Sequence, residues 1–205
     1  LIDMLPAKPV GTAFTATATS LVEEDMKRSL GLGKAAVFRT GLDRPNLSFR
    51  VIHGADRKDF ILRYVQNHGK ESGIIYCATR KAVDEIYEML ASRKIKAGRY
   101  HAGMEDNARE KEQEDFSFDR IHVMVATNAF GMGIDKSNVR YVLHYQMPKS
   151  MEAYYQEAGR AGRDGAKAEC ILLYSGQDVG IQRYLIESGT QTDGQKPVSY
   201  THLTL

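Results

Sequence analysis

The chain has 205 residues and 42% of them are hydrophobic, which is enough for one packed domain plus additional segments. Its net charge of +2 is close to zero, so no overall basic field marks a nucleic-acid-binding protein, and phosphate binding would have to come from a few well-placed groups. No run approaches the roughly 18 apolar residues of a membrane span, and Cys77 and Cys170 lie in apolar runs. We therefore expect no membrane partner, a reducing cytosol and buried free thiols.

The first part of the chain is predicted to hold one helix and a connecting region. A short strand is expected over residues 10–14. A helix is expected to begin at Ser20, which has a glutamate three residues later as in a capping box, and to end at Gly31. Residues 32–45 combine Gly, Asp, Arg and Pro around a short predicted strand at 35–39. This composition is typical of a linker.

A second unit is predicted over residues 46–188, where strands and helices alternate. Apolar runs predict strands at 47–53, 73–77, 97–101, 121–127, 139–145 and 168–174. Amphipathic patterns predict helices around 60–65 and at 79–93, 107–116, 150–158 and 177–187. Because the strands are apolar on both faces, we predict an α/β fold with a parallel sheet and helices on both faces, and ligands beyond the carboxyl ends of the strands. Residues 189–205 lack any period and are expected to be a disordered or foreign tail.

Two of the predicted strands end in residues that could meet a phosphate. Thr79 follows the strand at 73–77 and opens a helix, so its hydroxyl and the neighbouring amides could bind phosphate. The same spacing fits a simple helix N-cap equally well. The strand at 97–101 ends at His101, and a lone histidine in such a place is more often structural than catalytic.

A third strand end carries a denser pattern. The apolar run at 121–127 leads into Thr127, followed by Gly131, Gly133 and Asp135. The glycines permit a sharp turn, and Thr127 with nearby amides could contact a sugar-phosphate backbone. A turn that binds no ligand explains this pattern equally well when it is taken alone.

The most informative segment is 156–165, which places Arg160 and Arg163 three positions apart among glycines, directly after a helix-like run that ends near Gln156. Glycines remove side-chain bulk and allow close approach to a ligand. Arginine offers a planar, permanently charged fork that suits phosphate oxygens. The segment therefore predicts a phosphate-facing edge.

Taken in order, these segments resemble the successive motifs of superfamily-two helicases. The particular residues in them closely resemble those of the RecQ family of DNA helicases. The resemblance covers roughly residues 10–188 and is carried by 15–17, 43–46, 75–77, 100–104, 125–127, 129–135 and 154–163. It implies two RecA-like domains that clamp ATP and Mg²⁺ between them. On this basis residues 1–31 are the end of the first domain, 32–45 the linker and 46–188 the second domain.

The resemblance also implies roles for individual residues. Arg163 is similar to the arginine finger, Arg160 to its companion phosphate ligand, and Gln156 to the polar residue that helps to orient the site. Asp135 and Gly133 would line the same nucleotide cleft. Contacts to the DNA backbone are implied for Thr79, Arg80, His101 and Thr127.

Departures from the family pattern define what the chain is expected to lack. It has no Gly-x-x-x-x-Gly-Lys-Ser/Thr phosphate loop and no magnesium-binding acid box, so we expect no metal ligands here and no ATPase activity from the chain alone. We expect the C-terminal motor half, truncated at both ends, of a 3′-to-5′ DNA helicase. Its partners would be single-stranded or partially duplex DNA and the missing first RecA-like domain in cis, in the cytoplasm or on a bacterial nucleoid. The alternative is a RecA-like nucleic-acid-binding module that is not an enzyme.

Overall fold

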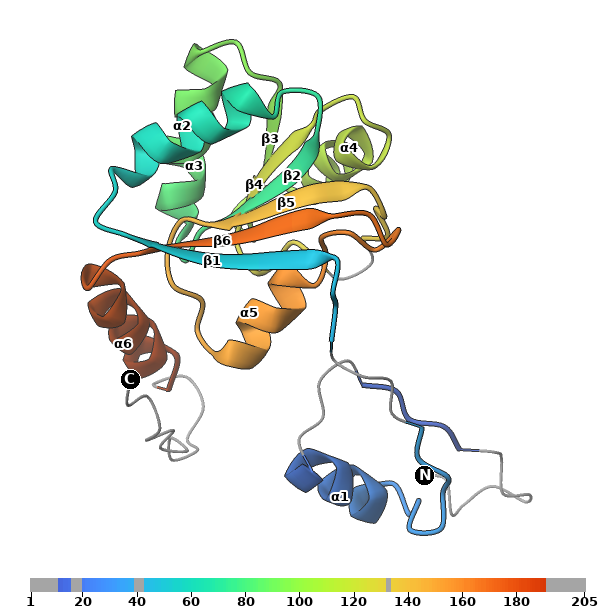
Figure 1. Cartoon of the computed structure of the whole chain (residues 1–205). Helices are drawn as coiled ribbons and strands as arrows, with labels where there is room; N and C mark the ends of the chain where they lie inside the picture. The colour runs from blue at the N-terminus through green and yellow to red at the C-terminus, as the bar shows by residue number, and fades with distance from the viewer. Residues whose placement is uncertain (1–10, 16–19, 39–42, 132–133, 191–205) are drawn as a thin grey trace. The chain divides into compact units, whose positions relative to one another are not determined.

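The computed structural model describes residues 11–15, 20–38, 43–131 and 134–190. The chain divides into two compact units, Leu1–Arg44 and Pro45–Leu205. In the first unit, helix α1 (Ser20–Ser29) is followed by Gly31, whose φ of +66° ends the helix (Figure 1). The strands predicted at 10–14 and 35–39 are wrong for the residues that the structure describes, 11–14 and 35–38, which have no strand pairing. Their aromatic residues, Phe14 and Phe38, are each 92% exposed, so neither segment has a packing surface.

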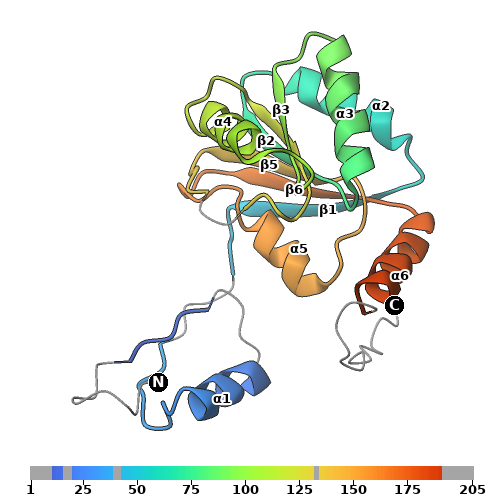
Figure 2. The same cartoon turned by 180° about the vertical axis from the view of Figure 1, so that it is seen from behind.

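The second unit is built on a six-stranded sheet in which every pairing is parallel (Figures 1 and 2). Its strands are β1 (Leu47–His53), β2 (Ser72–Tyr76), β3 (Ala97–Tyr100), β4 (Val123–Ala126), β5 (Val139–His144) and β6 (Ala168–Tyr174). Their order across the sheet is β1-β6-β5-β2-β4-β3. The bounds of β1 and β6 coincide with the predicted ones, β2 has the predicted length but begins one residue earlier, and β3, β4 and β5 are one to three residues shorter than predicted.

Five helices connect or follow these strands: α2 (Arg57–Asn67), α3 (Arg80–Ser92), α4 (Asp106–Ser117), α5 (Met151–Ala158) and α6 (Gln177–Thr190). Side-chain caps fix three of the helix starts. Asp56 accepts from two amides of α2, Thr79 accepts from Ala82 of α3, and Ser150 accepts from Ala153 of α5. The N-cap role that the sequence allowed for Thr79 is thus confirmed, and Ser150 caps the helix predicted at 150–158.

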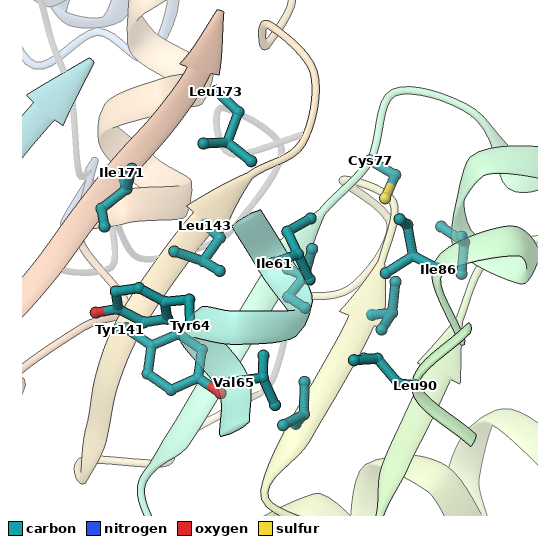
Figure 3. Packing of buried hydrophobic residues seen from close by; sticks show 14 of the residues in the cluster. Ile61, Tyr64, Val65, Cys77, Ile86, Leu90, Tyr141, Leu143, Ile171 and Leu173 are labelled. Atoms are coloured by element: carbon teal, nitrogen blue, oxygen red, sulfur yellow. The ribbon is translucent and has the colours of Figure 1, made fainter. Parts of the chain in front are cut away.

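Helices cover both faces of the sheet, because alternate residues of each strand face opposite sides. On one face, α2 and α3 pack against the sheet in one core cluster, in which Figure 3 shows Ile61 of α2 toward Leu143 and Ile86 of α3 next to Cys77. On the other face, α4 and α5 contribute Phe116 and Ala158 to a second core, which contains Ile74, Met124, Val142 and Cys170. The prediction of a parallel sheet with helices on both faces is confirmed. Both cysteines are buried and free, as expected.

Candidate functional site

The segment at 159–166, here called the arginine turn, joins α5 to β6 and carries both candidate arginines. Arg160 extends from the end of α5 and donates from Nη1 to the carbonyl oxygen of Gly131 at 2.6 Å. Its Nε is buried and has no hydrogen-bond partner among the described residues. Burial of a guanidinium nitrogen without a partner is costly, and an anion beside it would satisfy the donor.

Arg163 lies farther along the arginine turn and contacts the segment that precedes β5. Its Nη1 donates to the carbonyl oxygen of Ile134 at 3.1 Å and to Oδ1 of Asp135 at 3.3 Å. The Arg163 side chain is 37% exposed and that of Asp135 is 93% exposed, so water screens their ion pair strongly. Solvent-borne ligands can therefore reach the guanidinium. The structure thus brings together Arg163 and Asp135, while the predicted Gly133 lies outside the described residues.

The arginine turn is held against β5 by groups that the sequence did not single out. Arg140 donates from Nη2 to both carboxylate oxygens of Asp164, at 2.7 and 2.6 Å. The hydrogen bond from Arg140 lowers the pKa of the Asp164 carboxyl below its ordinary value. The amide of Gly162 donates to the carbonyl of Val139 at 2.9 Å. Arg140 and Asp164 are 24 positions apart in the chain, so no local pattern could have paired them.

Gln156, the third residue predicted for this site, lies on α5 one helical turn before Arg160, and its side chain is exposed. A residue that the sequence analysis passed over lies nearer. The hydroxyl of Tyr76, at the end of β2, donates to the carbonyl of Phe130 at 3.1 Å, next to the Gly131 carbonyl that Arg160 binds. Burial raises the pKa of Tyr76, so the phenol remains a donor.

The candidate DNA contacts occupy the ends of three other strands. Thr79 follows β2 and caps α3, accepting from the Ala82 amide at 3.2 Å, while Arg80 beside it is exposed. The hydroxyl of a capping threonine still has its hydrogen to donate, so capping and phosphate binding are compatible. Thr127 follows β4 and is 9% exposed, and its Oγ1 lies 3.4 Å from the Ala129 amide, which donates to it.

His101, at the end of β3, has both ring nitrogens engaged within the protein. The amide of Gly103 donates to Nδ1 at 3.1 Å, so the ring hydrogen lies on Nε2, 3.3 Å from Asp84. Asp84 also accepts from Arg99 at 2.6 Å. The ring is 7% exposed. This geometry favours the structural role for His101, which is to hold the turn at Gly103 close to Arg80; a Cβ built at Gly103 would lie 3.2 Å from Arg80 Nη1.

A cavity of about 400 Å³ opens at the same edge of the sheet, between the ends of β2 and β5 and the helices α5 and α6. Ala78, next to Thr79, and Asn128, next to Thr127, both line it. The buried pair of His144 and Glu157, 2.9 Å apart, forms part of its wall. The cavity therefore adjoins two of the candidate DNA contacts.

The candidate residues thus separate onto two opposite edges of the sheet. Thr79, His101 and Thr127 follow the carboxyl ends of β2, β3 and β4, whereas Asp135 and Arg163 precede the amino ends of β5 and β6. The arginine turn thus does not lie beyond the carboxyl ends of the strands, where ligands were expected. The physical reason is that this turn connects a helix to the following strand, and such connections in a parallel sheet lie at its amino edge.

Comparison with known proteins bears on the whole of the second unit. The family model described as "Helicase conserved C-terminal domain" matches residues 56–165. The chain is 54% identical over 196 residues to the "ATP-dependent DNA helicase RecQ" of Bacillus subtilis, covering 96% of this chain and 33% of that protein. It is 43% identical over 183 residues to the protein of the same name from Haemophilus influenzae, covering 89% of this chain and 29% of the relative. The chain thus spans about a third of the length of these curated relatives.

The fold is similar to a solved structure of low sequence identity, "S. cerevisiae Dbp5 bound to RNA and ADP BeF3", with a TM-score of 0.70 and 21% identity over 90% of this chain and 49% of that one. This likeness confirms the predicted α/β, RecA-like fold. In the described part of the chain, no helix has the length and apolar character needed to cross a bilayer. By its family match the chain belongs to the helicase conserved C-terminal domain family, and in sequence it is similar to RecQ proteins.

Proposed function

We propose that this chain is the second motor half of an ATP-dependent DNA helicase of the RecQ type. The observation that carries the proposal is the separation of two sets of residues. Arg160, Arg163 and Asp135 gather at the amino edge of the sheet, and the candidate DNA contacts gather at its carboxyl edge. A motor that couples a nucleotide to movement on DNA needs two such surfaces on one rigid body. In this proposal residues 46–188 form the second RecA-like domain, 1–31 the end of the first, 32–45 the linker and 189–205 a tail.

The amino edge fits the phosphates of ATP. Arg160 has a buried Nε without a partner in the described part of the chain, and Arg163 is 37% exposed, so both guanidinium groups have donors that suit an anion. ATP with Mg²⁺ supplies the phosphoryl group whose transfer to water drives the motor. Arg163 acts as the arginine finger, Arg160 binds phosphate beside it, and Gln156, Asp135 and Gly133 line the cleft. The phosphate loop and the magnesium ligands come from a first RecA-like domain in cis.

The carboxyl edge fits the backbone of a DNA strand. Thr79 and Arg80 stand at the N-terminus of α3, where free amides and the helix dipole favour a phosphate. Thr127 supplies a second hydroxyl, and His101 supports the turn beside Arg80. These groups read no base edges, so binding is independent of sequence. The strand bound is single-stranded or partially duplex DNA, tracked from 3′ to 5′, in the cytoplasm or on the nucleoid of a bacterial cell.

The experiment compares this chain with the longer protein that contains it. The longer protein should hydrolyse ATP with stimulation by single-stranded DNA and separate duplexes with a 3′ overhang. The isolated chain should do neither, and should bind single strands weakly, with a salt dependence that is measurable but shallow because few phosphates are contacted. Robust ATP hydrolysis by the isolated chain, or a longer protein that binds DNA yet never hydrolyses ATP, would overturn the proposal. The second result would indicate a nucleic-acid-binding module instead.

A further inference from the structure

The arginine turn has few buried residues of its own that could hold it in place. Within the turn, only Ala161 and Gly162 are buried after Arg160, and residues 163–166 are exposed. Gly162 has a φ of +56° and Gly165 a φ of +83°, a backbone region that side chains disfavour. A turn with this composition cannot define the position of Arg163 by its own packing. Contacts from outside must do so.

Asn46, at the entrance to β1, makes such contacts with the turn. Its Nδ2 donates to the carbonyl oxygens of Gly162 and Ala166, both at 2.9 Å. An amide NH₂ has two hydrogens, so both donors are used. The two carbonyls flank Arg163, with Gly162 immediately before it and Ala166 three residues after it. Asn46 therefore holds both ends of the short segment that carries the candidate finger.

The backbone of Asn46 is itself fixed in place. The amide of Ala168 donates to the backbone carbonyl of Asn46 at 3.0 Å, and the next residue, Leu47, pairs with Ala168 in the β1–β6 ladder. A Cβ built at Gly162 would lie 2.5 Å from Asn46 Nδ2, so the absence of a side chain at Gly162 is what admits the amide. Asn46 thus connects the arginine turn to the rigid start of the β1–β6 ladder, while Arg140 and Val139 hold it from β5.

We propose that Asn46 is a positioning residue for Arg163: its two hydrogen bonds set where the guanidinium lies relative to the reacting phosphate, although Asn46 touches no substrate. The inference rests on the proposed function, since it assigns Arg163 to catalysis. It predicts an effect on rate rather than on nucleotide binding, because displacement of a transition-state contact by about 1 Å can cost up to 10²-fold in rate.

The first test needs no catalytic activity and uses this chain. In Asn46→Ala, hydrogen exchange of the backbone amides of Gly162 and Asp164 should become about 10-fold faster. These amides donate to the carbonyls of Val139 and Ser137, and these bonds should open more often once Asn46 no longer holds the turn. Amides in β5 should be unchanged. Asn46→Asp is the sharper variant. It has the same shape but cannot donate, and it places a carboxylate against two carbonyl oxygens, so its effect should be at least as large as that of Ala.

The second test measures ATP hydrolysis by the longer protein. Asn46→Ala should lower kcat about 10- to 100-fold and change the KM for ATP by less than about threefold. In an Arg163→Ala background the same substitution should have little further effect, because its action passes through Arg163. The matched control is Asn67→Ala at the exposed end of α2, which should leave kcat unchanged.

The two tests distinguish the possible failures. A longer protein without ATPase activity contradicts the proposed function, and hydrogen exchange then decides whether Asn46 holds the turn. An active enzyme whose kcat is unaffected by Asn46→Ala overturns the positioning role. Unchanged exchange at Gly162 and Asp164 overturns it as well, and so does an Asn46→Asp variant that behaves like the wild type.

Discussion

Arg160 binds the carbonyl oxygen of Gly131 at 2.6 Å, and this contact ties the arginine turn to the segment that begins at Thr127. That segment starts at the carboxyl edge of β4 and reaches the amino edge of β5 near Asp135. Phe130 within it is buried and accepts from Tyr76 at the end of β2. One continuous segment therefore touches a candidate DNA contact at one end and both candidate arginines at the other.

Gly131→Ala should displace the Arg160 guanidinium. A Cβ at Gly131, where φ is +154°, would overlap that side chain, which must then swing away from the carbonyl it binds. Because the overlap involves the end of a flexible side chain, the chain should still fold, with a loss of about 1–3 kcal/mol from backbone strain. In the longer protein, ATP affinity and kcat should fall together.

The control for this prediction is Gly176→Ala, since a Cβ there meets nothing within 4 Å. Melting temperature and ATP binding are measured for both variants. In an Arg160→Ala background, Gly131→Ala should reduce ATP affinity no further. An additive loss in the double variant would show that the glycine acts independently of Arg160.

Arg163→Ala should lower kcat for ATP hydrolysis in the longer protein by on the order of 10³-fold, with a much smaller change in nucleotide affinity. The reason is that a finger meets charge that develops in the transition state. Arg163→Lys should restore little, because an ammonium cannot reproduce the planar fork. The pair with Asp135 is exposed, so either substitution should change the melting temperature by less than about 3 °C.

Arg63→Ala provides a matched control, because this exposed arginine on α2 also pairs with a carboxylate, Asp59. It should leave turnover unchanged. If Arg163 merely tied the turn to neighbouring acids, Arg163→Ala would lower thermal stability and leave turnover per folded molecule near normal. A stable Arg163→Ala enzyme with near-normal kcat removes the finger assignment.

Local patterns predicted the elements of the second unit well, because hydrophobic period and capping residues are local signals. Ser150 and Thr79 cap helices as their positions indicated, and β1 and β6 have the predicted bounds. The same signals failed at 11–14 and 35–38. There the residues have a β-like composition, but the described residues give them no strand partner and no core to pack on.

The candidate site was predictable only in part, since its contacts join residues far apart in the chain. The spacing of Arg160 and Arg163 indicated phosphate binding, and their place between a predicted helix and a predicted strand of a parallel sheet implies the amino edge, a consequence that the general expectation about carboxyl ends overlooked. Asn46 and Gly162 are 116 positions apart, so their hydrogen bond follows only from the β1–β6 pairing. For His101, the residue pattern favoured a structural role while the family resemblance implied a DNA contact, and the engagement of both ring nitrogens favours the structural role.

Arg80→Ala should weaken single-strand binding by this chain and leave its stability almost unchanged. Arg80 is exposed at the start of α3, so it contributes charge rather than packing. Loss of one phosphate contact should reduce the slope of log K against log salt by about 0.7. Binding to oligonucleotides of different sequence should fall equally. Arg93→Ala, an exposed arginine just past the other end of the same helix, is the control and should keep the wild-type slope.

The ion pair of Lys136 and Asp119 should make stability depend on pH. The Lys136 side chain is 3% exposed, and its Nζ lies 2.7 Å from Asp119 Oδ1, which also accepts from Ser72 at 3.0 Å. The hydrogen bond from Lys136 lowers the pKa of Asp119 in the folded chain. Because the folded pKa lies below the unfolded value of about 3.9, this pair stabilises the chain above that pH, and the stabilisation is lost as pH falls through the folded pKa.

Asp119→Asn should therefore lower the free energy of unfolding at pH 7 by about 2 kcal/mol, since it leaves a buried ammonium without its counter-charge. The expected loss is below the 3–5 kcal/mol typical of a broken buried pair, because Asp119 itself is 47% exposed. Asp119 has a φ of +57°, which asparagine also tolerates, so backbone strain does not confound the comparison.

Denaturant unfolding of Asp119→Asn at pH 7, 5 and 3 should show a constant difference in the free energy of unfolding from wild type down to about pH 5, and a smaller difference at pH 3. Adding Lys136→Met to Asp119→Asn should recover most of the lost free energy of unfolding. As a control, Asp59→Asn, which breaks the exposed pair with Arg63, should lower the free energy of unfolding by less than about 1 kcal/mol. A difference that stays the same at pH 3 would show that Asp119 stabilises the chain by something other than its charge.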